Sequence, residues 1–131
     1  MAHPYHHATS SVRKWGGRVE DYQPLHDWFD EHKAHFADFR YRAMRHHSAG
    51  IFECERVFGT TISNSAGRVV PVRLIGEQHC QEDFNGRIPT LADWFRCLRP
   101  ESWMSPNTRA LMVESLGEDV YAPPTSSAAL S

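Results

Sequence analysis

The spacing of hydrophobic residues predicts a mainly α-helical chain. Between residues 20 and 34, Leu25, Trp28 and Phe29 recur at the i, i+3, i+4 spacing of one helix face. A longer apolar stripe runs through residues 36–58, with charged residues on the opposite side. Three shorter helices are predicted over residues 3–15, 74–84 and 90–98, and Thr90-Leu91-Ala92-Asp93 at the start of the last resembles a capping box.

Residues 60–73 have a β-type pattern instead. Two runs rich in Val, Ile and Thr flank Asn64-Ser65-Ala66-Gly67, which is typical of a hairpin with a glycine-containing turn. Pro71 marks an edge position or a strand end, because proline cannot donate a ladder hydrogen bond. The pattern as a whole predicts a small, mainly α domain of about four to five helices with one short β-hairpin.

The predicted helical domain spans residues 1–104. Residues 105–131 include Pro123-Pro124 and a Ser/Ala-rich ending, and we expect them to form a partly disordered C-terminal extension. A chain of 131 residues is about the length of one ordinary domain.

The composition indicates which partners and which cellular compartment to expect. The formal net charge of −2 creates no general attraction for nucleic acid or an anionic membrane. No apolar run approaches the roughly 20 residues that a membrane span needs. Three widely spaced cysteines indicate reduced thiols, and the first seven residues lack the apolar core of a signal peptide. We therefore expect a cytoplasmic protein that binds neither membrane nor nucleic acid.

His79 and Asp83 form the first group that could carry chemistry. They lie four residues apart, on one face of a predicted helix. An imidazole nitrogen and a carboxylate one turn apart can share a divalent ion such as Zn²⁺, Mn²⁺ or Fe²⁺. The alternative is a polar helix face with a local His–Asp pair.

A second group lies in the long apolar stripe. His47 is on the stripe, and Glu55 follows about two helical turns later, which makes both candidate ligands beside the neighbouring His46. The alternative for His47 is a core histidine whose nitrogens are satisfied by ordinary hydrogen bonds.

His26-Asp27, with an earlier histidine and the later Asp83, imitates the His…His-Asp…Asp order of HD-type metal-dependent phosphohydrolases. Those enzymes use the metal to activate water and polarise phosphate. The match is weak, because His-Asp is a common dipeptide.

Arg40, Arg42 and Arg45 form a basic stretch that could hold a phosphate, a nucleotide or an acidic protein surface. The alternative is a solvated helix face paired with Asp38 and Glu53. No phosphate-binding loop, dinucleotide fingerprint, zinc-protease motif or nucleophile elbow is present in the sequence, so no motif fixes a reaction.

Three segments together resemble a known family. They are Val12-Arg-Lys-Trp-Gly-Gly, the Arg45-His-His-Ser-x-Gly-Ile-Phe-x-x-Glu-x-x-Phe-Gly run, and Ile75-Gly-Glu-Gln-His-x-x-Glu-Asp followed by Gly86-Arg-Ile-Pro-Thr and Asp93-Trp94. Over roughly residues 2–104 the chain resembles small uncharacterised proteins encoded by tailed phages and prophages. The resemblance implies the cytoplasm of a bacterial host but no established function. Its shared pattern comprises His26, Asp30, His46, His47, Glu55, Glu77, His79 and Asp83.

Our first hypothesis is a metalloprotein with one zinc or manganese ion. His47, Glu55, His79 and Asp83 would converge on it, and His46 or an N-terminal histidine would complete the set. A catalytic version would activate water against a phosphate or amide bond, with Glu77 as general base.

The second hypothesis, from a different class, is a non-catalytic binding protein. It would occupy a host or defence protein, or sequester a phosphate-bearing small molecule such as a nucleotide signal, through Arg40, Arg42 and Arg45. A third possibility is that the histidines build a polar core and bind no ligand.

Overall fold

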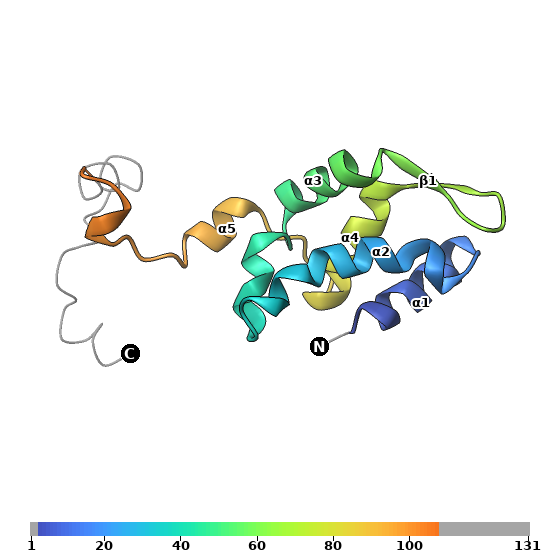
Figure 1. The fold of residues 1–131 in the computed structure, drawn as a ribbon, viewed down its shortest axis with the longest axis horizontal. Helices are drawn as coiled ribbons and strands as arrows, with labels where there is room; N and C mark the ends of the chain where they lie inside the picture. Colours follow the sequence, from blue (N-terminus) through green and yellow to red (C-terminus); the bar gives the residue numbers. More distant parts are fainter. Residues whose placement is uncertain (1–2, 108–131) are drawn as a thin grey trace. The chain divides into compact units, whose positions relative to one another are not determined.

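Helix α4 (Val72–Asp83) lies at the centre of the fold and contacts three other helices that are distant in sequence (Figure 1). The structure is a computed structural model that describes residues 3–107. The chain divides into two compact units, Met1–Trp94 and Phe95–Ser131. All residues discussed below as a candidate site belong to the first unit.

The first two predicted helices are confirmed. Helix α1 (Pro4–Trp15) ends at Gly16, whose positive φ of 79° suits glycine. Helix α2 (Val19–Asp30) packs beside it. Where the sequence predicts a helix continuing to residue 34, the α-helix gives way to a 3₁₀ turn, η1 (Glu31–Ala34).

The prediction of one long helix over residues 36–58 is wrong. The segment contains a 3₁₀ helix, η2 (Phe39–Met44), and then helix α3 (Ser48–Phe58). Between them His47 has an extended backbone (φ −165°, ψ 171°) and caps α3, because its Nδ1 accepts a hydrogen bond from the Gly50 amide at 3.0 Å. The apolar stripe therefore continues across a bend that spacing alone does not show.

Gly50 makes this bend possible. A Cβ at that position would overlap the carbonyl group of Arg45, so the backbone approach requires a residue without a side chain. The bend places His46 between two helical segments and turns it toward the interior, where it is fully buried.

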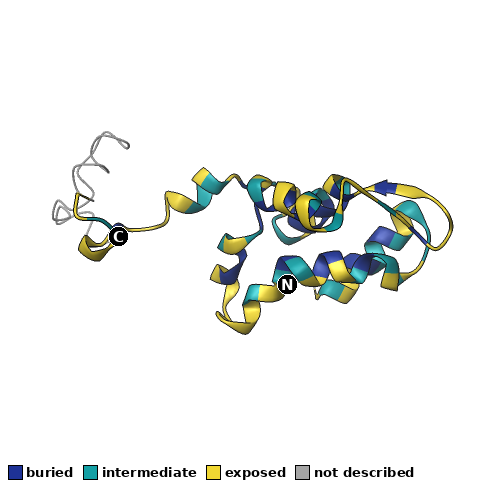
Figure 2. Cartoon of the chain, turned by 45° about the horizontal axis from the view of Figure 1, so that its top comes forward, coloured by how far each residue is buried: buried dark blue, intermediate teal, exposed yellow. Residues whose placement is uncertain are grey.

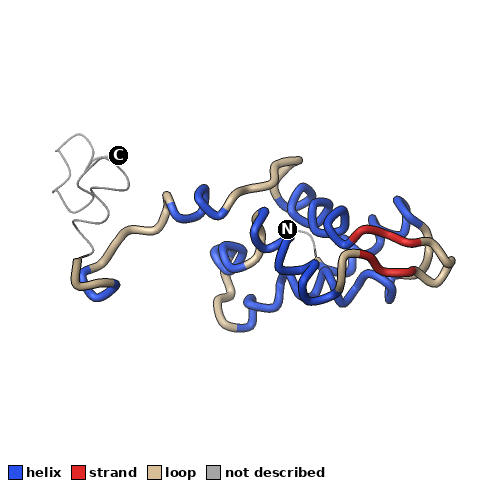
Figure 3. Tube along the Cα trace, turned by 90° about the horizontal axis from the view of Figure 1, so that it is seen from above, coloured by secondary structure: helices blue, strands red, loops and turns tan. Residues whose placement is uncertain are grey.

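The predicted hairpin is confirmed, and its two strands, β1 (Thr61–Ser63) and β2 (Val69–Pro71), are red in Figure 3. Ile62 pairs with Val70 across them. The Asn64 side chain attaches its turn to the helices: Nδ2 donates to the Trp15 carbonyl at 3.0 Å, and Oδ1 accepts from two turn amides. Pro71 is the strand end that the sequence predicts, and it is also the residue from which α4 begins.

Buried positions fall mainly on the mutually facing sides of the helices of the first unit, as the dark blue segments of Figure 2 show. Helix α5 (Leu91–Phe95) begins with the predicted capping box, in which Thr90 and Asp93 each bind the other's backbone amide. The core residues are Ala8, Tyr22, Leu25, Phe29, Ile51, Cys54, Val70, Val72, Ile75 and Cys80.

The described residues confirm a small, mainly α fold with one antiparallel hairpin. The second unit contributes a short 3₁₀ helix, η3 (Ser102–Met104). Within the described residues, no helix combines the length and apolar character needed to cross a bilayer. Most of the predicted C-terminal extension, residues 108–131, lies outside the described residues.

Replacing Gly76 with Ala should destabilise the fold by about 1–3 kcal/mol, because overpacking has a cost of that size. The added Cβ would stand 3.1 Å from atoms of Phe29 and Ile51, where α4 crosses its neighbours. Chemical denaturation measures the change. Gln81→Ala, on the exposed side of α4, should leave stability nearly unaltered. Equal stabilities for the two variants would contradict the close approach.

Candidate metal centre

Four side chains from three separated parts of the chain converge in the interior. Asp30 ends α2, His46 lies at the bend before α3, and His79 and Asp83 lie on α4. The His46 Nε2 is 3.1 Å from Asp30 Oδ1 and 3.1 Å from Asp83 Oδ2. The His79 Nε2 is 3.4 Å from each of the same two oxygens. The two Nε2 atoms are 3.1 Å apart.

These distances match the edges of a small tetrahedron. Zinc binds nitrogen and oxygen ligands at about 2.0–2.1 Å, so tetrahedral ligand atoms lie about 3.3–3.4 Å from one another. The five distances above are 3.1 or 3.4 Å, and all four atoms lie within 4.8 Å of one another. The group could therefore hold one metal ion at its centre.

Each ligand candidate has a local reason for its place. His79 and Asp83 are one turn apart on α4, as the sequence predicts. The Tyr41 hydroxyl donates to Asp30 Oδ1 at 3.2 Å, and the Trp94 indole donates to the His46 carbonyl at 3.0 Å. Two aromatic residues thus restrain the two parts of the group that do not lie on α4.

The group is buried, and its carboxyl groups and His79 differ in charge at neutral pH. Burial lowers the pKa of His79 to about 4, so this imidazole is neutral at pH 7. Burial would raise the pKa of Asp30 and of Asp83, but hydrogen bonds from histidines outweigh it and hold both carboxyl groups well below their usual range. Both carboxyl groups are therefore ionised at neutral pH.

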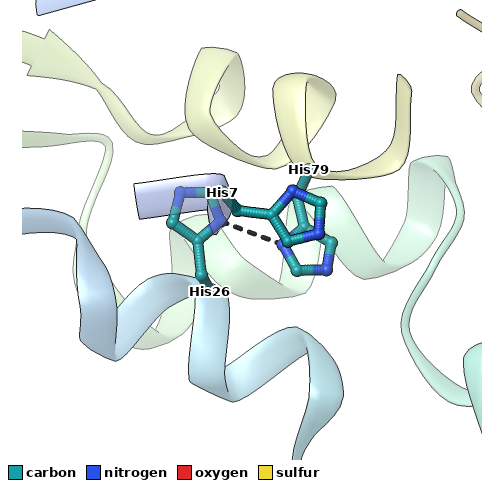
Figure 4. A group of neighbouring side chains, drawn as sticks. All are labelled: His7, His26 and His79. Atoms are coloured by element: carbon teal, nitrogen blue, oxygen red, sulfur yellow. Dashed lines mark hydrogen bonds between the residues drawn. The ribbon is translucent and has the colours of Figure 1, made fainter. Parts of the chain in front are cut away.

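A second cluster adjoins the first on the other side of His79. His7, His26 and His79 come from α1, α2 and α4, and all three are fully buried (Figure 4). The Nδ1 atoms of His26 and His79 are 2.9 Å apart, and a dashed line joins them in Figure 4. The ring of His7 lies over that of His79, with centroids 3.9 Å apart.

This histidine cluster is better described as hydrogen-bonded than as a metal site. The Nδ1 atoms of His26 and His79 are hydrogen-bond partners at 2.9 Å, and the other nitrogen of His79 faces Asp30 and Asp83 instead of this cluster. The lone pair of an imidazole nitrogen lies in the plane of its ring. Because the His7 ring lies over the face of the His79 ring, the nitrogens of the two rings do not point at one common metal position. We therefore assign the candidate centre to Asp30, His46, His79 and Asp83.

The other oxygen of Asp83 faces two nitrogen groups. Its Oδ1 is 3.2 Å from His7 Nε2 and 3.5 Å from Arg42 Nη2. His7 Nδ1 also lies 2.7 Å from Glu82 Oε1. Burial lowers the pKa of His7, but the carboxylates of Asp83 and Glu82 outweigh it and raise this pKa above its ordinary value. These neighbours orient Asp83 with Oδ2 toward the centre.

The structure brings together three of the five metal ligands proposed from the sequence, His46, His79 and Asp83. His47 lies outside the group, because its Nδ1 accepts from the Gly50 amide and its Nε2 is 3.1 Å from the Ala43 carbonyl. Glu55 also lies outside, since the helical stripe that would align it with His47 begins only after the bend.

Two other acidic candidates face away from the centre. Glu77 Oε2 is 3.6 Å from Arg73 Nε on the same helix, and the Glu77 side chain is 33% exposed. Asp27 accepts a hydrogen bond from Gln23 at 2.9 Å on the exposed side of α2. The general-base and HD-type arrangements therefore do not form around this group.

The three arginines do not share one face. Arg40 is exposed and binds Asp38, whereas Arg42 is largely buried and faces Asp83. Arg45 donates to the Trp28 carbonyl at 2.7 Å and stacks over the indole ring of Trp28. Each arginine thus has its own local role in this structure.

Sequence reasoning missed Asp30 as a ligand, although the family resemblance includes it. Ser11 and Gln78, which contact the histidine cluster, were not proposed as site residues, although Gln78 lies within the Gly-Glu-Gln-His motif of the family resemblance. Cys54 and Cys80 are buried thiols whose pKa burial raises to about 12, and Cys97 is exposed. All three are reduced thiols outside any disulfide, as the sequence predicts.

In the presence of a chelator, acidification from pH 6.5 to pH 4 should lower the melting temperature. The pKa of His79 falls from 6.5 to about 4 on folding, so in this range the unfolded chain binds a proton that the folded protein excludes. Stability present above pH 6.5 is therefore lost as the pH falls toward 4. His7, with its raised pKa, acts in the opposite sense.

His79→Gln isolates this contribution, and its melting temperature should depend less steeply on pH over the same interval. An equally steep dependence in the variant would show that His79 is not held neutral by burial.

Comparison with known proteins identifies a family but no activity. A search of curated proteins and a search of solved structures each found no match to the chain. Residues 2–104 match a family described as a domain of unknown function. Because this match covers well over half of the 131 residues, the protein belongs to the family named Domain of unknown function (DUF6915).

Proposed function

We propose that this protein is a metal-binding domain that holds one zinc ion through Asp30, His46, His79 and Asp83. The observation that carries the proposal is the close spacing of four ligand atoms drawn from three separate parts of the chain. Five of their six separations are 3.1–3.4 Å, and all six are within 4.8 Å. Packing of apolar side chains alone gives no reason for such spacing.

The hydrogen-bonding capacity of the group supports a cation. His46 Nε2 lies within 3.1 Å of three acceptor-type atoms, yet a neutral imidazole has at most one proton at that nitrogen. Asp30 and Asp83 are both ionised in a buried space, and among the residues that the structure describes only Asp83 has an arginine partner, Arg42, at its other oxygen. Buried charges are costly unless they are paired or coordinate a metal, and one divalent ion neutralises this pair.

The ligand set favours zinc over other common divalent ions. Imidazole nitrogens and carboxylate oxygens in a tetrahedron are ligands that zinc accepts, whereas magnesium requires an octahedral, oxygen-rich shell. Manganese, the other ion expected from the sequence, belongs with oxygen-rich octahedral sites. The spacing therefore supports zinc as the first choice.

A structural role fits this geometry better than hydrolysis. Catalytic zinc sites keep a position open for water, whereas four protein ligands close the tetrahedral shell. Both histidines are fully buried, and the side chain of Asp83 is 1% exposed. Glu77, the expected general base, faces Arg73 instead. We infer that the ion links α2, the bend before α3, and α4, so that metal binding and folding are coupled.

Protein purified without an affinity tag or chelator should contain about one zinc ion per chain, because one complete ligand set is present among residues 3–107. Elemental analysis measures the content. Removing the ion with a chelator should lower the melting temperature by roughly 10 °C or more, because a ligand at a hundredfold excess over its Kd contributes about 2.7 kcal/mol. A chain that gains no stability from zinc would contradict the proposal.

Asp30→Asn should remove most of the zinc-dependent stabilisation, because it takes one negative charge and one strong ligand from the centre. Asp27→Asn is a matched control: it alters the same residue type on the same helix, at an exposed position bonded only locally to Gln23. Zinc titration followed by thermal melting distinguishes the two variants. The proposal fails if Asn at residue 27 weakens zinc binding as much as Asn at residue 30.

A further inference from the structure

We propose that Ser11 and His26 are positioning residues for the metal centre, and this inference rests on the proposed zinc site. Through a buried chain of hydrogen bonds they fix the tautomer of His79, with its Nδ1 protonated and its Nε2 free to bind the ion. The chain runs from Gln78 through Ser11 and His26 to His79. It makes metal affinity dependent on α1, a helix that supplies no ligand.

Gln78 determines which atom donates and which accepts at the start of this chain of hydrogen bonds. Its Nε2 lies 2.8 Å from the His7 carbonyl and 3.0 Å from Glu82 Oε1. Both of those atoms accept hydrogen bonds, so they must face the amide NH₂ group. The amide oxygen of Gln78 is therefore the atom that faces Ser11, at 2.7 Å.

Ser11 passes this direction on. Its hydroxyl group has one proton, and two of its neighbours, the Gln78 amide oxygen and the His7 carbonyl at 3.1 Å, can only accept. The hydroxyl proton of Ser11 is therefore donated to the Gln78 amide oxygen or to the His7 carbonyl. Its third neighbour, His26 Nε2 at 2.8 Å, must then donate to the hydroxyl oxygen.

His26 carries the constraint to the metal ligand. A neutral imidazole that is protonated on Nε2 has a lone pair on Nδ1. That lone pair accepts from His79 Nδ1 at 2.9 Å, so the proton of His79 is on Nδ1. The Nε2 of His79 is then left with a lone pair, and it is the nitrogen that faces Asp30, His46 and Asp83.

Burial makes this arrangement restrictive. Ser11, His26 and His79 are fully buried and Gln78 is 1% exposed, so bulk water does not replace a lost partner. Partners that fix the tautomer of a metal-binding histidine typically contribute 10–100-fold to metal affinity. Ser11 lies on α1 and His26 on α2, so both helices must be docked before the tautomer of His79 is fixed.

The first test compares zinc affinities by competition with a chromogenic chelator. Ser11→Ala should weaken zinc binding by about 10–100-fold, because His26 loses the acceptor that fixes its tautomer. Ala8→Gly loosens the same buried face of α1 but removes no atom of the hydrogen-bond chain. The zinc affinity of this variant should match that of the wild type. Equal affinities for Ser11→Ala and the wild type would overturn the inference.

The second test reads the tautomers directly and does not depend on a variant that folds. Long-range ¹H–¹⁵N spectra of the zinc-loaded wild-type protein should show His26 protonated on Nε2 and His79 protonated on Nδ1. Protonation of His26 on Nδ1 would overturn the inference while leaving the zinc centre intact. Failure of the wild type to bind zinc would instead refute the proposed function, and this inference with it.

Discussion

The arrangement depends on one electrostatic constraint: two ionised carboxylates and two imidazoles point at a common buried centre. The pKa values of Asp30 and Asp83 lie well below their usual range, so both are ionised, and burial keeps His79 neutral at pH 7. Four groups with lone pairs and few protons repel one another unless a cation lies among them. The same ion would satisfy all four, and it would join segments up to 53 residues apart, since the ligands range from Asp30 to Asp83.

Helix α4 gives this constraint its place in the fold. It contributes two ligands to the centre, and through Gln78 it also contacts the polar chain that reaches α1. Gly76 lets the same helix approach Phe29 and Ile51 closely, so the apolar core and the polar centre lie on one element. Packing and ligand geometry are therefore linked: a shift of α4 to relieve the core would also move His79 and Asp83.

The sequence predicted much of the fold and three of the four residues of this centre. The hairpin, the capping box at Thr90 and the His79–Asp83 pair follow from short-range spacing, which sequence displays directly. The bend at residues 45–47 could not be predicted from spacing, because it depends on a close backbone contact that only Gly50 permits. Missing the bend made His47 look like a ligand in place of Asp30. The hydrogen bond between Ser11 and Gln78 was not predictable either, since the two residues become neighbours only after the helices dock.

Zinc K-edge X-ray absorption of the protein purified without tag or chelator tests the central claim most directly. The account predicts a four-coordinate ion with nitrogen and oxygen ligands at about 2.0 Å and the outer-sphere scattering of two imidazoles. A six-coordinate ion, a sulfur ligand, or no bound zinc would contradict it.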